Sequence, residues 1–379
     1  MACGAGRLCF FKQSLPPAPP SAKGVLWSWG VNDLGQLGLG DTTNRSTPVQ
    51  VNTPASWRQV AGKIVHSLGI APDGKLYAWG QNAFGELGVG DRNSRSTPTQ
   101  VGSLTWTDIG TGGSVSGFAH SIGISGEKLF AWGLNTSGQL GLGDLDSRST
   151  PVQVGSASTW TMVRCGILNS FGISEGKLYA WGNNGPRYSL GLGDSSDRST
   201  PTQVGAMSTW TLVAPDPSDL TMHSLGLADG GKAFAWGRNT SGQLGLGDTT
   251  DRSVPVQVGS MSWTTVSAGF GFSLGISDGK LYAWGSNDNG IGELGLGDTS
   301  PRSTPTQVGV ATDWTVCSAG AEGTAAGISG GKLYTWGKNL YGQLGLGDID
   351  ARSTPTQVGV ATTWQEIECS KGGMLGLLA

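Results

Sequence analysis

The feature that most constrains the fold of this chain is a sevenfold repeat. A Trp-Gly pair, a Leu-Gly-(Leu/Val)-Gly-Asp run and a Thr/Val-Pro step recur in the same order along the chain. The pairs begin at Trp29, Trp79, Trp132, Trp181, Trp236, Trp284 and Trp336. A period near 50 residues sustained over 379 residues predicts a repeat architecture. A motif present in every copy is scaffold, so we expect function where the copies differ.

Each copy contains four short segments with the alternation typical of β-strands. In the copy that begins near Trp79 they cover residues 75–79, 99–101, 106–109 and 120–124. Two-residue turns such as Asp73-Gly74, Glu175-Gly176 and Asp278-Gly279 predict a hairpin between the fourth strand and the next first strand. The sequence therefore predicts an all-β, seven-bladed β-propeller of four-stranded antiparallel blades.

The two ends of the array are predicted to pair. Residues 25–29 form a first strand and residues 374–378 form a fourth strand. Since these strand types are hairpin partners elsewhere, their pairing would close the ring and remove exposed strand edges. The predicted domains are a Pro-rich N-terminal arm, residues 1–23, and the propeller, residues 24–379.

Two further features recur in every copy and are interpreted as structural. Fourteen of the 15 tryptophans fall at two fixed repeat positions, where they are predicted to pack between blades. Each copy also places an Asp four residues before an Arg, from Asp41 and Arg45 to Asp348 and Arg352. A ring of ion or substrate sites is the alternative, but sevenfold recurrence favours a loop clasp. The proline that follows each Arg is predicted to open the second strand.

Composition excludes several function classes. The net charge of −3 argues against a nucleic-acid partner, which needs a basic stripe. No apolar run is long enough to insert in a membrane, and the arm lacks the apolar core of a secretory signal. Five cysteines lack metal-ligand spacing, and Cys165 is predicted to fill the core. No cofactor or metal is expected, and the predicted location is cytoplasmic or virion-associated. In the arm, Phe10 and Phe11 are candidate docking anchors.

The repeat resembles the regulator-of-chromosome-condensation repeat, a family named for the chromatin-bound exchange factor of the Ran GTPase. The residues that carry the likeness are Leu76-Tyr77-Ala78-Trp79-Gly80, Gly85-Glu86-Leu87-Gly88-Val89-Gly90-Asp91, Thr97-Pro98 and His120-Ser121. The resemblance covers about residues 24–379 and implies a seven-bladed propeller that binds macromolecules through one face or a projecting loop. Nucleotide exchange does not carry over, because no insertion comparable to the family's wedge-like hairpin is present. The uniform repeats are more similar to bacterial and phage-encoded members.

The copies disagree mainly in repeats two, four and six. Alternating strand directions place the first-to-second and third-to-fourth connections on one face, and the departures lie in these connections. They include residues 110–117 of repeat two and 288–291 of repeat six. Because binding residues gather on loops held by rigid scaffolds, we predict a partner-binding surface there, with neutral loop drift as the alternative. Its candidate residues are Pro186, Arg187, Tyr188, Pro215, Asp216, Pro217, Asp219, Asp288 and Asn289.

No constellation of catalytic residues is found in the sequence. His66, His120 and His223 occupy equivalent positions and are interpreted as hydrogen-bonded structural residues rather than metal ligands. The Gly-Gln-Leu-Gly-Leu-Gly-Asp run lacks the Lys and the strand–turn–helix setting of a phosphate loop. We therefore predict a non-enzymatic protein-interaction or structural module. A more specific form of this prediction is a component associated with a virus particle or a cell surface. The alternative is a regulatory factor, similar to a guanine-nucleotide exchange factor, that acts on a small GTPase.

Overall fold

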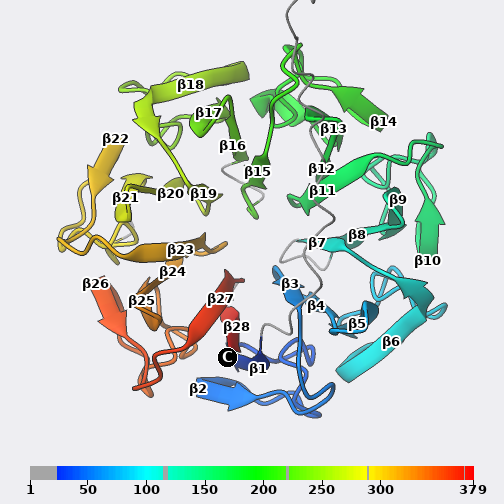
Figure 1. Ribbon diagram of the computed structural model, residues 1–379, viewed down its shortest axis with the longest axis horizontal. Helices are drawn as coiled ribbons and strands as arrows, with labels where there is room; N and C mark the ends of the chain where they lie inside the picture. The colour runs from blue at the N-terminus through cyan, green and yellow to red at the C-terminus, as the bar shows by residue number, and fades with distance from the viewer. Residues whose placement is uncertain (1–23, 114–117, 219–221, 288–289, 371) are drawn as a thin grey trace, which may run out of the picture.

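The computed structural model describes residues 24–113, 118–218, 222–287, 290–370 and 372–379, and these form a ring of seven blades (Figure 1). Each blade is a four-stranded antiparallel sheet. The strands nearest the axis are β27 (Trp364–Cys369), β3 (Gln59–Gly62), β7 (Asp108–Gly113), β11 (Trp160–Cys165), β15 (Leu212–Pro215), β19 (Thr265–Ala268) and β23 (Trp314–Ala319). Among the described residues, no helix is long and apolar enough to cross a bilayer.

The next two strands of each blade form the predicted hairpins. The second strands are β28 (Gly373–Leu378), β4 (His66–Ile70), β8 (Ala119–Ser125), β12 (Asn169–Ser174), β16 (His223–Ala228), β20 (Phe272–Ser277) and β24 (Thr324–Ser329). The third strands are β1 (Val25–Gly30), β5 (Lys75–Gly80), β9 (Lys128–Gly133), β13 (Lys177–Gly182), β17 (Lys232–Gly237), β21 (Lys280–Gly285) and β25 (Lys332–Gly337). Positive φ at Glu175 and Asp278 confirms the tight turns there. Asp73 lacks a positive φ, because Ala71 and Pro72 lengthen that turn to four residues.

The outer strands are the most exposed. They are β2 (Arg45–Gln50), β6 (Arg95–Thr105), β10 (Arg148–Gln153), β14 (Arg198–Gln203), β18 (Arg252–Ser262), β22 (Arg302–Gln307) and β26 (Arg352–Gln357). Each begins at the clasp Arg, three residues before the proline that was predicted to open it. Because these strands have an unpaired outer edge, the proline removes a donor that the ladder does not use.

The ring closes as predicted. β1 pairs with β28 in a continuous register from Val25 opposite Leu378 to Gly30 opposite Gly373. The indole Nε1 of Trp29 donates to the carbonyl of Gln343 at 3.0 Å. Trp79 makes the same contact with Gln36 at 2.9 Å. The Trp-Gly indoles therefore join all seven blade junctions, including the one that links the two ends of the chain.

The core lies between neighbouring blades. Trp106 and Trp132 are buried with ring centroids 5.5 Å apart, and similar tryptophan pairs recur at other junctions. A glycine on the second strand makes room for them: a Cβ at Gly123 would lie 2.7 Å from the ring of Trp106. Cys165 is 1% exposed within the same layer, and burial raises the pKa of its thiol to about 12. It is the small core filler that the sequence predicted.

Candidate functional site

One face of the ring carries the variable connections. From the axis outward, each blade consists of the third and fourth strands of one repeat followed by the first and second strands of the next repeat. The connection between the second and third strands of a repeat therefore crosses to the next blade. All neighbouring strands are antiparallel. Connections such as 63–65, between β3 and β4, and 81–94, between β5 and β6, therefore emerge on the same side. We call this side the loop face.

The fourth repeat changes its connection between β13 and β14. A 3-10 helix, η1 (Gly185–Arg187), precedes Tyr188, which adopts the left-handed conformation with φ 59° and ψ 35°. Gly35 holds the corresponding place in the first repeat with φ 76°. A non-glycine residue at positive φ is strained, and such strain persists where the surrounding structure enforces it. Arg187 is partly exposed, and its charge adds to burial in lowering the pKa of Arg238.

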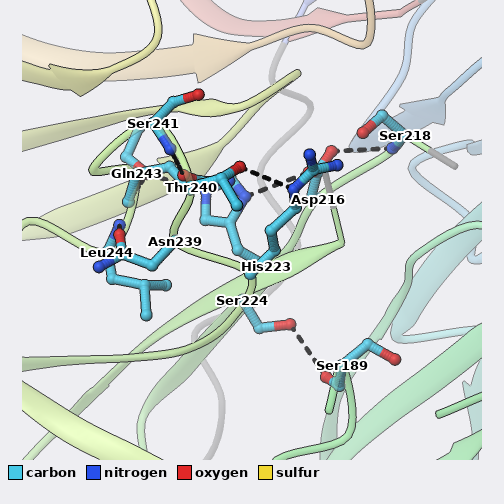
Figure 2. A network of polar contacts seen from close by, with 12 residues as sticks. Ser189, Asp216, Ser218, His223, Ser224, Asn239, Thr240, Ser241, Gln243 and Leu244 are labelled. Carbon is cyan, nitrogen blue, oxygen red and sulfur yellow. Dashed lines mark hydrogen bonds and ion pairs between the residues drawn. The ribbon is translucent and has the colours of Figure 1, made fainter. Parts of the chain in front are cut away.

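The other predicted residues of the fourth repeat turn inward. Pro215, Asp216 and Pro217 are buried between β15 and β16. The Asp216 carboxylate lies 3.1 Å from Nδ1 of His223 and accepts a hydrogen bond from the backbone N–H of Ser218 (Figure 2). Asn183 and Ser189 of the other connection line a small cavity with Asp216, so the two loops meet. These residues shape the loop face from beneath rather than covering it.

Asp216 and His223 form part of a chain that has the order of a hydrolase triad. Nε2 of His223 lies 2.9 Å from the Ser273 hydroxyl on the next blade. That hydroxyl donates to the carbonyl of Gln243 at 2.8 Å and is fully buried. A serine nucleophile needs access to substrate and a base that takes its proton. Ser273 has neither, so this group joins two blades.

The other two histidines make the same bond without an acid. Nε2 of His66 lies 2.8 Å from Ser121, and Nε2 of His120 lies 2.9 Å from Ser170. Burial lowers the pKa of both imidazoles to about 3. The three histidines therefore serve as hydrogen-bonding residues between adjacent blades. In the described ranges, no group of three potential metal ligands is present.

The repeated Asp and Arg residues form the predicted clasp in all seven copies. In each, an Arg Nη2 lies 2.6 Å from an Asp oxygen. Nη1 of Arg95 donates to the Asn93 carbonyl at 2.7 Å, and Asp91 accepts from the Asn93 backbone N–H at 2.8 Å. This backbone contact is the largest cause of the lowered pKa of Asp91. Each clasp thus closes its own loop.

Several predicted residues lie outside the described part of the chain. These are the arm anchors Phe10 and Phe11, together with Asp219, Asp288, Asn289 and residues 114–117. Pro186 belongs to η1, but its side chain also lies outside the described part. The described part of the candidate surface therefore consists of Arg187 and Tyr188 above the buried Pro215–Pro217 segment.

The structure reveals an apolar hollow that the sequence interpretation missed. Val31, Leu34, Ile64, Val65 and Tyr341 line a space of about 200 Å³ on the loop face, together with the polar residues Asp33 and Gln36. Leu34 is 37% exposed and Tyr341 is 46% exposed, so these two side chains are available to a partner.

A sequence signal for this hollow exists. The residue before the loop glycine is large and apolar or aromatic in four consecutive copies of the ring, at Ile291, Tyr341, Leu34 and Phe84. The third and fifth repeats have Ser137 and Ser241 instead. Phe84 also contacts the exposed Phe118 with ring centroids 6.0 Å apart. The apolar surface therefore extends across adjacent blades.

Comparison with known proteins agrees with this architecture. The ultraviolet-B receptor UVR8 of Arabidopsis thaliana is 31% identical over 304 residues, which cover 76% of this chain and 65% of the receptor. Among solved structures, human WBSCR16 superposes with a TM-score of 0.80 at 20% identity, covering 94% of this chain and 98% of that one. Yeast RCC1 (Prp20), solved bound to Kap60, gives a TM-score of 0.78 at 20% identity, covering 100% and 97%.

The sequence profile of the regulator of chromosome condensation (RCC1) repeat matches seven segments. They are residues 23–67, 73–119, 127–172, 175–214, 230–276, 278–326 and 330–375. The chain spans about 65% of the length of the receptor, so the activity of that whole protein is not transferred here. Matches over most of the propeller show that this chain belongs to the RCC1 repeat family.

Proposed function

We propose that this protein is a protein-binding module that uses its loop face as the docking surface. The observation that carries the proposal is the apolar hollow, in which exposed Leu34 and Tyr341 stand beside Ile64 and Val65. Contiguous exposed apolar surface on a soluble fold is typical of an interaction site. The partner that fits it presents an aliphatic or aromatic anchor residue.

Arg187 and Tyr188 extend the proposed surface to the fourth repeat. Arginine and tyrosine are enriched in binding hot spots, and Tyr188 is held in a conformation that glycine adopts elsewhere. Ser224, next to the His223 that contacts the buried Asp216, donates to the Ser189 carbonyl of this loop at 3.4 Å. In this role Pro215, Asp216 and Pro217 position the surface and do not touch the partner.

Relatives supply support of a general kind. Yeast Prp20 was solved bound to Kap60, and the description of a second Prp20p structure names binding to Gsp1p and histones. These likenesses are 20–21% identical, so they support a propeller that serves as a binding platform and not these partners. Association with a virus particle or cell surface stays a prediction, which neighbouring capsid or tail genes would support.

The test uses residues that the chain already tolerates. Leu34→Ser and Tyr341→Ser together convert the hollow to the serine found at Ser137 and Ser241. Val310, which is 91% exposed on the connection between β22 and β23 and therefore on the opposite face, gives the control Val310→Ser. Partners captured from native cell extract are measured by quantitative mass spectrometry. We expect the double variant to capture at least tenfold less partner, since a hot-spot residue contributes roughly 2 kcal/mol or more. The control variant should capture as much as the wild type.

Equal capture by the wild type and both variants would remove the hollow as the docking site. The regulatory alternative is examined separately, with candidate small GTPases loaded with fluorescent guanine nucleotide. Accelerated nucleotide release by the full chain would replace the proposed function with exchange activity.

A further inference from the structure

The central channel carries departures from the repeat that the loop face does not explain. Each repeat has a second recurring tryptophan at or just before its inner strand, such as Trp57 before β3. The second and fourth residues after this tryptophan alternate with residues that point into the core, so they face the axis. These pairs are Gln59 and Ala61, Asp108 and Gly110, Met162 and Arg164, Leu212 and Ala214, Thr265 and Ser267, Val316 and Ser318, and Glu366 and Glu368. The seven inner strands surround this axis in Figure 1.

Charge is confined to one part of the channel wall. Three consecutive blades, those of β15, β19 and β23, present only neutral side chains at these positions. The other blades present Asp108, Arg164, Glu366 and Glu368, and Lys63 follows β3 directly. A charge in a channel is costly to desolvate, and a neutral residue serves the scaffold equally well in the other copies. The scaffold of the other copies does without such charges, so the charges mark a place where the copies differ.

The charges border a real cavity. Lys63, Arg164, Glu366 and Glu368 line a cavity of about 190 Å³ that is open to the channel. The opposite side is formed by short side chains, including Ala214, Ser267 and Ser318. All four charged residues are partly exposed, so solvent reaches them. A cavity of this size admits only a small molecule, about the size of an amino acid, and its few convergent polar groups are typical of a small-molecule site.

The wall satisfies some of its charges and leaves others unmatched. Arg164 forms an ion pair with Asp108 at 3.0 Å, and Asp108 also accepts from Gln59 Nε2 and the Val163 backbone N–H. Lys63 and Glu368 form no ion pair or hydrogen bond with any described residue. Burial raises the pKa of Glu368; the charge of Lys63 lowers it, that of Glu366 raises it and that of Arg164 lowers it, with burial the largest influence. A further cation beside Glu368 would offset the free-energy cost of burying its ionised carboxylate.

We propose that the channel binds a small zwitterion, a molecule of amino-acid size that carries one ammonium and one carboxylate. Glu368, with Glu366, receives the ammonium group, and Lys63 receives the carboxylate, with Arg164 as the neighbouring cation. The short side chains of β15, β19 and β23 leave room for the carbon chain between them. This site is independent of the loop face, so either proposal can fail without the other.

The experiment compares ligands that share a carbon chain and differ in charge. Isothermal titration of the full chain uses γ-aminobutyrate, n-butylamine and butyrate, and glycine and 6-aminohexanoate vary the separation of the charges. We expect at least one zwitterion to bind at least tenfold more tightly than both the amine and the carboxylate. If no zwitterion binds at millimolar concentration, or if the amine or the carboxylate binds equally well, the proposal is wrong.

Variants locate the site and control for folding. Lys63→Met and Glu368→Gln should each weaken zwitterion binding at least tenfold, whereas Lys128→Met, at the exposed first residue of β9, should not change it. The exchanged pair Lys63→Glu with Glu368→Lys retains one charge of each sign in the cavity, so it should restore binding if both single variants lose it. Binding that survives both single substitutions would place the ligand elsewhere and overturn the proposal.

Discussion

The two histidines without an acidic partner predict a steep loss of stability in mild acid. His66 and His120 are 2% and 0% exposed, and burial lowers the pKa of each to about 3. An unfolded histidine takes up a proton near pH 6.5. Between these values the unfolded chain binds more protons than the folded chain, so the free energy of unfolding falls as pH decreases.

The size of the effect follows from the pKa difference. Each histidine contributes about 1.4 kcal/mol of lost stability per pH unit below about pH 6.5. At pH 5 the two together should have removed roughly 4 kcal/mol, a large part of the 5–15 kcal/mol that is typical of a folded domain. The clasp aspartates act in a lower range: their lowered pKa values give stability that is present above about pH 3.8 and lost as pH falls below it.

The perturbation is the double variant His66→Asn, His120→Asn, which copies the natural Asn169 at the same register. Urea unfolding of the wild type and the variant is followed by tryptophan fluorescence at pH 7 and pH 5. Glu86 and Glu368 have raised pKa values, which stabilise the folded state as pH falls. Both residues are present in the wild type and the variant, so their contributions cancel in the comparison. The wild type should lose about 4 kcal/mol more than the variant. Equal losses in the two proteins would refute the assignment of neutral, buried imidazoles.

Three further predictions concern the scaffold and are all measured by denaturant unfolding at pH 7. Gly85→Ala should lower the free energy of unfolding by at least about 3 kcal/mol, because the new Cβ would lie 2.5 Å from the Ser149 Cα. Gly102→Ala should lower it by only about 1–2 kcal/mol, because Gly102 has a positive φ but open space around it. Equal losses would contradict the steric argument. Trp132→Phe should lower the free energy of unfolding by about 1 kcal/mol more than Trp106→Phe. Of these two indoles only that of Trp132 donates a hydrogen bond, to the Glu86 carbonyl at 2.9 Å. A smaller loss for Trp132→Phe would contradict this prediction. Arg95→Lys should cost less than about 1 kcal/mol, since its clasp is exposed, and a loss of several kcal/mol would show that the clasps hold the ring together.

The scaffold was predictable because each of its features recurs. Trp79, its glycine neighbour and the clasp of Asp91 and Arg95 appear in seven copies, and each copy repeats the strand pattern around them. Closure was predictable for the same reason, since residues 25–29 and 374–378 complete a blade that is intact elsewhere. Strand bounds were less accurate: β6 (Arg95–Thr105) begins before and ends after the predicted segment, because an exposed outer strand has little apolar alternation to mark its ends.

The candidate site was predictable only as a face. Antiparallel order places the variable loops on one side, but it does not show which loop residues point outward. Asp216 looked like a surface residue in a Pro-rich loop, yet its carboxylate is buried against His223. The apolar hollow was missed because its residues belong to different repeats, Leu34 to one and Tyr341 to another 307 positions later. Comparing one repeat position across all copies would have exposed it.

The same comparison separates two kinds of variation in this ring. The tryptophans and glycines at the blade junctions are fixed, because a change there meets buried rings or backbone on the next blade, as at Gly88 beside Trp132. Variation is therefore tolerated mainly at two surfaces outside this core, the loop face and the wall of the channel. On the loop face it produces apolar side chains that suit a macromolecular partner. In the channel it produces charges of both signs around a cavity too small for a folded partner, which suits a small zwitterion instead.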